Sequence, residues 1–151
     1  MGLDMYLYKK TFISSSEWTN EEKRDSIEIT QGGKPHPKIK AERIKYVIED
    51  VGYWRKANAI HKWFVDNVQK GVDDCGEYFV GASQLSKLKE LCVEVLENRE
   101  KCGELLPTES GCFFGSTDYD DWYFGSLIET IQIIDEALSD NDGEYYYHSS
   151  W

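Results

Sequence analysis

The two ends of the chain have an alternating or strand-like arrangement of apolar and polar residues. From Leu3 to Tyr8 every second residue is apolar, which places Leu3, Met5 and Leu7 on one side of a predicted β-strand. Residues 144–151 have the aromatic-rich composition of a strand, and we expect them to pair with the first one. Further short strands are predicted at residues 26–30, 78–80 and 112–114.

Between the two ends, apolar residues recur at the three- and four-residue spacing of an α-helix. Gly52 and Gly71 separate or end these segments, and Ser83 is placed to cap one of them. The four predicted helices run from about Lys38 to Val51, from Tyr53 to Gln69, from Ser83 through Leu96 and from about Tyr119 to Leu138. We therefore expect a single α+β domain over residues 1–151: a small antiparallel sheet, with the N- and C-terminal strands in it, packed with about four helices.

The composition is that of a globular protein, since 40% of the 151 residues are hydrophobic and 14% are aromatic. No apolar run is long enough to span a bilayer, and the first ten residues lack the basic and apolar regions of a signal peptide. An intracellular, cytoplasmic protein without a membrane partner is expected. The four cysteines are 17, 10 and 10 positions apart with no CxxC pair, so we expect reduced thiols, no metal site and no cofactor.

The formal net charge of −11 argues against nucleic-acid polymers as partners, because their phosphates repel an acidic surface. The charge is unevenly distributed, since residues 34–62 hold eight basic and three acidic residues, a local charge of +5. Two interpretations remain open for this region. Its basic side chains either form the solvated faces of two helices or create a positive region that attracts a small anion.

The stretch YWRKANAIHKWF, residues 53–64, brings polar residues onto the apolar side of a predicted helix. On a helical projection His61 falls inside the apolar arc, and Asn58, Lys62 and Arg55 follow along its edge. Burying an imidazole without a partner costs on the order of 1–3 kcal/mol, so His61 requires one. That partner is either a hydrogen bond in the core or a ligand in a pocket beside the helix. Together with the aromatic ring of Trp54, the row of Arg, Asn and His suits an anion with a flat ring, such as a nucleotide.

A second candidate site is CFFGSTDYDDWYFG, residues 112–125, in which Gly115, Ser116 and Thr117 precede a predicted helix. The free N–H groups at a helix start can hold phosphate, and the hydroxyls could bond the same anion. Helix capping by Thr117 explains the pattern equally well. Three aspartates near the helix start oppose an anion and could bind Mg²⁺, although such clusters occur without metal.

Recognised catalytic motifs are absent: the chain has no GxSxG, HExxH, GxGxxG or Walker A sequence. Cys75 follows Asp73 and Asp74, which would raise the pKa of its thiol and make it a poor nucleophile. The remaining enzymatic hypothesis has His61 as a general base acting on a phosphorylated substrate.

The stretches MGLDMYL, YWRKANAIHKWF, FFGSTDYDDWY and the terminal SSW resemble a group of small uncharacterised proteins encoded by bacteriophages and by bacteria in prophage-like settings. The matching stretches are spread over nearly the whole chain, and residues 12–38 match least. The resemblance implies a protein that acts inside a bacterial cell during infection, and it transfers no activity. By analogy, phage proteins of this size without catalytic motifs often inhibit host systems, for example by sequestering nucleotide signals that activate defence.

The sequence thus favours a non-enzymatic binder of a small, anionic, nucleotide-like ligand over an enzyme. The alternative is an acidic inhibitor that docks on a basic host protein. A homo-oligomer is also compatible with the chain if the aromatic residues at 145–147 or Trp151 are exposed. The predicted ligand-binding residues are Trp54, Arg55, Asn58, His61, Lys62, Gly115, Ser116, Thr117, Tyr119 and Trp122.

Overall fold

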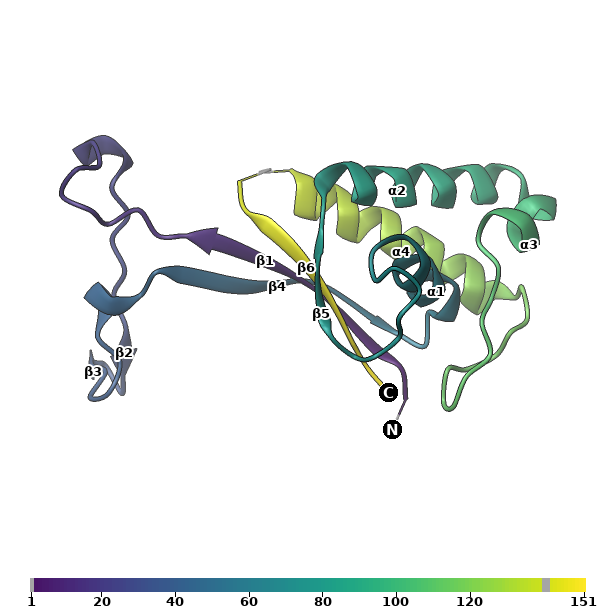
Figure 1. Ribbon diagram of the computed structural model, residues 1–151, viewed down its shortest axis with the longest axis horizontal. Coiled ribbons are helices and arrows are strands. Elements are labelled where there is room, and N and C mark those ends of the chain that lie inside the picture. The colour runs from purple at the N-terminus through teal and green to yellow at the C-terminus, as the bar shows by residue number, and fades with distance from the viewer. Residues whose placement is uncertain (1, 140–141) are drawn as a thin grey trace.

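The central sheet is built around the N-terminal strand, which has a neighbour on each side (Figure 1). The computed structural model describes residues 2–139 and 142–151. Strands β1 (Asp4–Phe12), β4 (Tyr46–Arg55), β5 (Glu77–Val80) and β6 (Glu144–Ser150) form one antiparallel sheet in the order β4-β1-β6-β5. The predicted pairing of the first and last strands is confirmed, with Leu7 opposite Tyr147.

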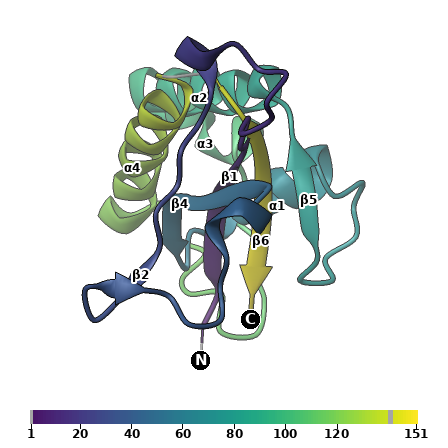
Figure 2. The same ribbon diagram turned by 90° about the vertical axis from the view of Figure 1, so that its left-hand side faces the viewer.

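The helices pack over one face of this sheet (Figures 1 and 2). They are α1 (Asn58–Asn67), α2 (Ala82–Glu97), the short α3 (Cys102–Leu105) and α4 (Asp121–Leu138). Leu3, Met5 and Leu7 point into the buried core, as their alternation predicts. The predicted α+β fold is therefore confirmed, and so are the helices at α2 and α4.

The opposite face of the sheet is not covered by helices and is rich in aromatic rings. Tyr6 stacks with Tyr8 and with His148, at ring-centroid distances of 6.0 Å in both pairs. Tyr53 from β4 packs against Tyr6 and donates a hydrogen bond to Asp4, with 2.5 Å between Oη and Oδ1. His148 therefore has aromatic neighbours on the sheet surface, which the sequence did not reveal.

The predicted helix at residues 38–51 is wrong. A single 3₁₀ turn at Ala41–Arg43 is followed after two residues by β4, which pairs with β1 from Tyr46 to Arg55 except at Val51. Consequently the helix expected from Tyr53 begins only at Asn58 as α1, and Trp54 and Arg55 belong to a strand. Two of the short strands are also wrong: residues 26–30 contribute only to the two-residue strand β2 (Thr30–Gln31), paired with β3 (Lys34–Pro35), and residues 112–114 form a turn.

An arm extends from one end of the sheet (Figure 1). It consists of the distal halves of β1 and β4 together with the intervening residues 13–45, which contain the β2–β3 hairpin and two 3₁₀ turns. A β-bulge lies where the arm leaves the body, because Leu7 pairs with Gly52 and Tyr8 pairs with Asp50, leaving Val51 without a partner across the ladder.

Replacing Gly52 by alanine should destabilise the protein, because helix α4 packs closely against this position. A Cβ at Gly52 would lie 2.4 Å from Cγ2 of Ile133 and 3.2 Å from Cβ of Leu7, neither of which is the end of a flexible chain. Overpacking of this kind costs about 1–3 kcal/mol of unfolding free energy. Urea unfolding followed by circular dichroism measures the change. The matched control is Gly125→Ala, where an added Cβ meets no atom within 4 Å.

Candidate functional site

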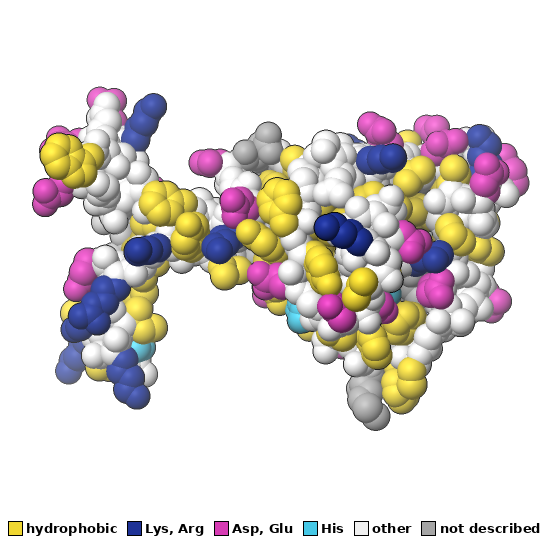
Figure 3. Space-filling model, viewed as in Figure 1, with side chains coloured by type: hydrophobic (Ala, Val, Ile, Leu, Met, Phe, Trp, Pro, Cys, Tyr) yellow, Lys and Arg dark blue, Asp and Glu magenta, His cyan; other side chains and the backbone are white. Residues whose placement is uncertain are grey.

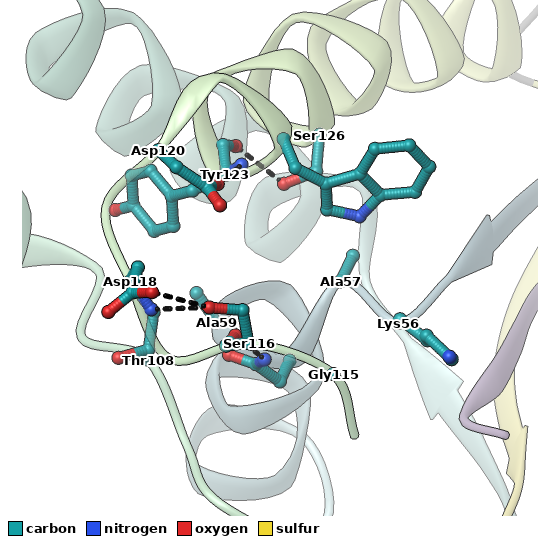
Figure 4. A pocket seen from close by; sticks show the side chains of 12 residues that line it. Lys56, Ala57, Ala59, Thr108, Gly115, Ser116, Asp118, Asp120, Tyr123 and Ser126 are labelled. Atoms are coloured by element: carbon teal, nitrogen blue, oxygen red, sulfur yellow. Dashed lines mark hydrogen bonds between the residues drawn. The ribbon is translucent and has the colours of Figure 1, made fainter. Parts of the chain in front are cut away.

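A cavity of about 330 Å³ opens between the first turns of α1 and α4 (Figure 4). One wall is the junction between β4 and α1, and the opposite wall is the start of α4. Two segments of the 106–120 connection form the rim. The lining residues are Lys56, Ala57, Asn58, Ala59, Thr108, Gly115, Ser116, Asp118, Asp120, Trp122, Tyr123 and Ser126.

The wall at α1 presents backbone donors to the cavity. Ala57, the N-cap residue, supplies no side-chain hydrogen bond, and the first intrahelical bond runs from the His61 N–H to the Ala57 carbonyl. Within the described residues, the N–H groups of Asn58, Ala59 and Ile60 therefore have no acceptor in the protein. These residues are buried, so an oxygen atom from a ligand is a physically suitable acceptor for the groups that face the cavity.

Lys56 stands at the entrance to this wall and has a left-handed backbone conformation, with φ of 55°. That conformation is unfavourable for a residue with a side chain, and backbone strain of this kind is concentrated at functional sites. The neighbouring Gly115, with φ of 92°, leaves just enough room for Lys56: a Cβ on Gly115 would lie 3.2 Å from Cβ of Lys56. The glycine therefore permits the close approach of the loop to the only lysine or arginine among the cavity-lining residues.

Asn58 lines the cavity, but both donor positions of its side chain are used in binding the loop. Its Nδ2 donates to the carbonyl oxygens of Phe114 (3.2 Å) and Ser116 (2.8 Å), and its Oδ1 accepts the N–H of Glu109 (3.1 Å). The amide thus fixes two segments of the loop against α1. Asn58 shapes the cavity and has no N–H left in its side chain to donate to a ligand, while Oδ1 keeps one lone pair.

The wall at α4 is acidic and aromatic. Asp120 caps the helix by accepting the N–H of Tyr123, while Asp118 accepts a hydrogen bond from the Ser116 hydroxyl at 3.1 Å (Figure 4). The Tyr123 hydroxyl donates to the Leu106 carbonyl, and burial raises its pKa well above the ordinary value, so this ring stays neutral. Trp122 remains 67% exposed at the cavity. This wall offers carboxylate acceptors and an aromatic surface.

His61 is buried in the core rather than in the cavity. Its Nε2 lies 3.0 Å from Oδ2 of Asp73, and its Nδ1 lies 2.7 Å from the hydroxyl of Tyr147 on β6. A carboxylate only accepts, so in the neutral ring Nε2–H donates to Asp73, and Nδ1 accepts from Tyr147. Asp73 also accepts the indole N–H of Trp151. The core hydrogen bond, which was one of the two explanations of His61, is therefore present.

Five other predicted ligand-binding residues also lie away from the cavity lining. Trp54 is fully buried and donates its indole N–H to Thr130, so its ring cannot stack on a ligand. Arg55 is exposed on β4, and its predicted place on the edge of a helix is wrong. Lys62 forms ion pairs with Glu109 and Asp66, and its hydrogen bonds to these carboxylates raise its pKa.

Thr117 and Tyr119 belong to the rim of the loop. The Thr117 carbonyl accepts a hydrogen bond from the Thr108 hydroxyl at 2.9 Å, and Tyr119 packs edge-on against Tyr123. Thr117 does not cap α4, because Asp120 does.

The structure thus brings together Asn58, Gly115, Ser116 and Trp122 from the predicted set, although they come from two stretches about fifty residues apart. It adds Lys56 and Thr108, which the sequence analysis missed, and Asp120, one of the three aspartates noted there near the helix start. Lys56 could have been found from the boundary between strand and helix, since it lies between the end of β4 and the N-cap residue of α1. Thr108 carries no local signal and lies at the cavity only because Asn58 ties its neighbour Glu109 to α1.

Among residues 2–139 and 142–151, no group of three or more His, Cys, Asp or Glu side chains is arranged to hold an ion. The cysteines of the described chain are free. No helix in that part of the chain combines the length and apolarity needed to cross a bilayer. On the α1 side the cavity offers backbone donors, with Lys56 at its edge and the Lys56 ammonium directed away from the other lining side chains (Figure 4), and on the α4 side it offers carboxylates with an aromatic ring. Comparisons with protein-family models, with curated proteins and with solved structures find no match to this chain.

Proposed function

We propose that the protein binds a small, anionic, nucleotide-like ligand in the cavity between α1 and α4, without turning it over. The observation that supports this most strongly is the α1 wall, where Lys56 stands beside unpartnered N–H groups of a buried helix start. Phosphate and carboxylate groups are the ligands that such an arrangement favours.

The carboxylates on the opposite wall restrict the class of ligand. Asp118 and Asp120 would repel a ligand that is anionic throughout. They suit a molecule that carries hydroxyl donors away from its anionic group, as the ribose of a nucleotide does. Trp122 then provides a surface on which a base can stack. The ligand is thus expected to have its phosphate at α1 and its sugar and base towards α4.

Binding without chemistry fits the surroundings of the cavity. The one histidine predicted as a general base has both ring nitrogens engaged and is 1% exposed, so it cannot accept a proton from a ligand in the cavity. The resemblance to phage proteins suggests a role for such binding: retention of a nucleotide signal that would otherwise activate a host defence.

A thermal-shift screen of the purified protein against nucleotides, cyclic nucleotides and ADP-ribose derivatives tests the proposal. A ligand at 100 times its dissociation constant stabilises the folded state by about 2.7 kcal/mol, a shift of roughly 5–10 °C for a domain of this size. Denaturing the complex and identifying the released compound by mass spectrometry shows whether it is unchanged. A compound recovered as a product would overturn the non-enzymatic assignment.

Lys56→Ala should weaken the affinity for the anionic ligand roughly tenfold or more, since it removes the side chain that makes a charge-assisted contact once it turns toward the anion. The unliganded melting temperature should change little, because alanine suffers the same left-handed conformation as lysine. The matched control is Arg55→Ala, which removes a neighbouring cation that does not line the cavity. Isothermal titration calorimetry of both variants separates the two residues. Equal losses in Lys56→Ala and Arg55→Ala would indicate a general charge effect and no phosphate site at α1.

A second candidate is an acidic inhibitor that docks on a basic host protein. The observation in its favour is a groove of about 700 Å³ between β4 and α4, whose lining includes Glu49, Asp50, Glu129 and Glu136 together with Lys9. If no compound shifts the melting temperature, charge reversal at Glu129 and Glu136 should abolish host-protein binding, as measured by pull-down from infected-cell lysate and reconstitution with the purified partner.

A further inference from the structure

The outer edge of β4 is an unpaired strand edge at the base of the arm. β4 is the terminal strand of the sheet, and among the described residues β1 alone pairs with it. Helix α4 packs near its second half, at Gly52 and Trp54. Its first half, residues 46–50, extends beyond the body as a two-stranded ribbon with β1 (Figure 1). An exposed strand edge of this kind is a template for pairing with another chain.

The side chains on this half-strand are unusually apolar for an exposed ribbon. Tyr46, Val47 and Ile48 are 48%, 37% and 61% exposed, respectively. Apolar and basic side chains alike are visible along the arm in Figure 3. Natural sheets protect free edges with charged residues or proline, and these three positions have neither. A second strand along this edge would cover part of the exposed apolar surface.

The sequence around these residues is complementary to itself. Lys45 precedes the apolar triplet, and Glu49 follows it. If two copies of this segment run antiparallel about Val47, Lys45 of each lies opposite Glu49 of the other, and Tyr46 lies opposite Ile48 of the second copy. Opposite charges and aromatic–β-branched pairs are both favourable cross-strand combinations. Neither Lys45 nor Glu49 takes part in an ion pair with the described residues of its own chain.

The residues before the strand add positive charge beside this edge. Residues 38–45 contain Lys38, Lys40, Arg43 and Lys45 against one acid, Glu42. Residues 41–43 form a 3₁₀ turn, so of this segment Ile44 and Lys45 continue the line of β4, opposite Asp50 and Glu49 of the other copy. A basic segment of each copy thus lies next to an acidic one of the other, as a two-fold symmetric interface requires.

We propose that two copies of the chain associate through their β4 edges, antiparallel about Val47, to form one continuous eight-stranded sheet. The Lys45–Glu49 pairs set the register, and the triplet at 46–48 supplies the apolar contact. This association is independent of the cavity between α1 and α4, which lies at the other end of β4.

The test is a charge swap followed by sedimentation velocity of the full-length chain from micromolar to submillimolar concentration. The wild type should form dimers. K45E places like charges opposite each other twice across the two-fold axis, and E49K does the same with the opposite sign. Each single variant should therefore weaken dimerisation roughly tenfold or more. Both positions are exposed, so circular dichroism should show unchanged folding.

Two further measurements, in which dimerisation should be restored, test this register specifically. The double variant K45E/E49K regains opposite charges and should dimerise as the wild type does. An equimolar mixture of the two single variants should form a heterodimer, detected by native mass spectrometry with one chain isotopically labelled. A wild type that is monomeric throughout the range overturns the proposal. So do single variants that dimerise normally, or a loss that neither the double variant nor the mixture reverses.

Discussion

Replacing His61 by alanine should lower the free energy of unfolding by about 3–5 kcal/mol, one of the two largest effects expected in this protein. The substitution removes a fully packed ring and leaves the hydroxyl of Tyr147 without its acceptor. Water cannot replace that acceptor easily, because Tyr147 is 0% exposed. Asp73 is partly exposed and can bond to water instead, so the loss of its bond to His61 contributes less to the drop in unfolding free energy. Urea unfolding monitored by tryptophan fluorescence gives the change directly.

The milder variant Tyr147→Phe isolates the hydrogen bond from the loss of packing. It removes only the hydroxyl and should cost about 1–3 kcal/mol, because the His61 Nδ1 is then unsatisfied. In a double-mutant cycle the two substitutions should be less costly together than the sum of the single effects.

The ligand affinity of His61→Ala should differ from that of Lys56→Ala. At a temperature where His61→Ala is folded its affinity should be unchanged, and a loss of binding would mean that the site includes the core of α1.

The wrong helix at residues 38–51 shows what local spacing leaves undetermined. Val47, Ile48 and Val51 recur at helical intervals, and we interpreted them as a buried helical face. In the structure the first two are exposed on the arm, and the β conformation is fixed by β1, about forty residues away along the chain. β-branched residues favour a strand, and that preference, with a partner available, overrides the spacing. By contrast, the long stripes of α2 and α4 had no competing pattern and were predicted correctly.

The candidate site was predictable only as two separate stretches. The sequence identified residues near Asn58 and near Ser116, and the structure joins them through the Asn58 amide. Because the helix boundary was predicted wrongly, the sequence analysis named Arg55 as the basic residue of the site. The residue that lines the cavity is its neighbour Lys56. The role of His61 could not be settled from one strand or helix, because Tyr147 is 86 residues away. A buried polar side chain reveals that a partner exists, and only the fold reveals which one.

Raising the pH above about 9 should destabilise the protein steeply, because three buried acidic groups must remain protonated in the folded state. Burial raises the pKa of the Cys92 thiol from 9.0 to about 12 and raises the pKa values of Tyr123 and Tyr147 well above 10.0. Below pH 9 these groups are protonated in both the folded and unfolded states, and stability is unaffected. Above it the unfolded chain loses protons that the folded chain retains, so unfolding becomes more favourable as the pH rises.

Each such group contributes up to about 1.4 kcal/mol per pH unit while only its unfolded form is deprotonated, so the free energy of unfolding should fall by up to about 4 kcal/mol per unit above roughly pH 10. Urea titrations at stepped pH, with reductant present and recovery checked by return to pH 8, measure this slope. Cys92→Ala should reduce the slope by about a third and move the onset from about pH 9 to about pH 10, because only the tyrosines then titrate. A slope that is the same in Cys92→Ala and in the wild type would contradict the burial of this thiol. Tyr147 is both the partner of His61 and one of these acids, so the packing of α1 on β6 contributes to the alkaline limit as well as to the buried hydrogen bond, while Cys92 on α2 and Tyr123 on α4 contribute the rest.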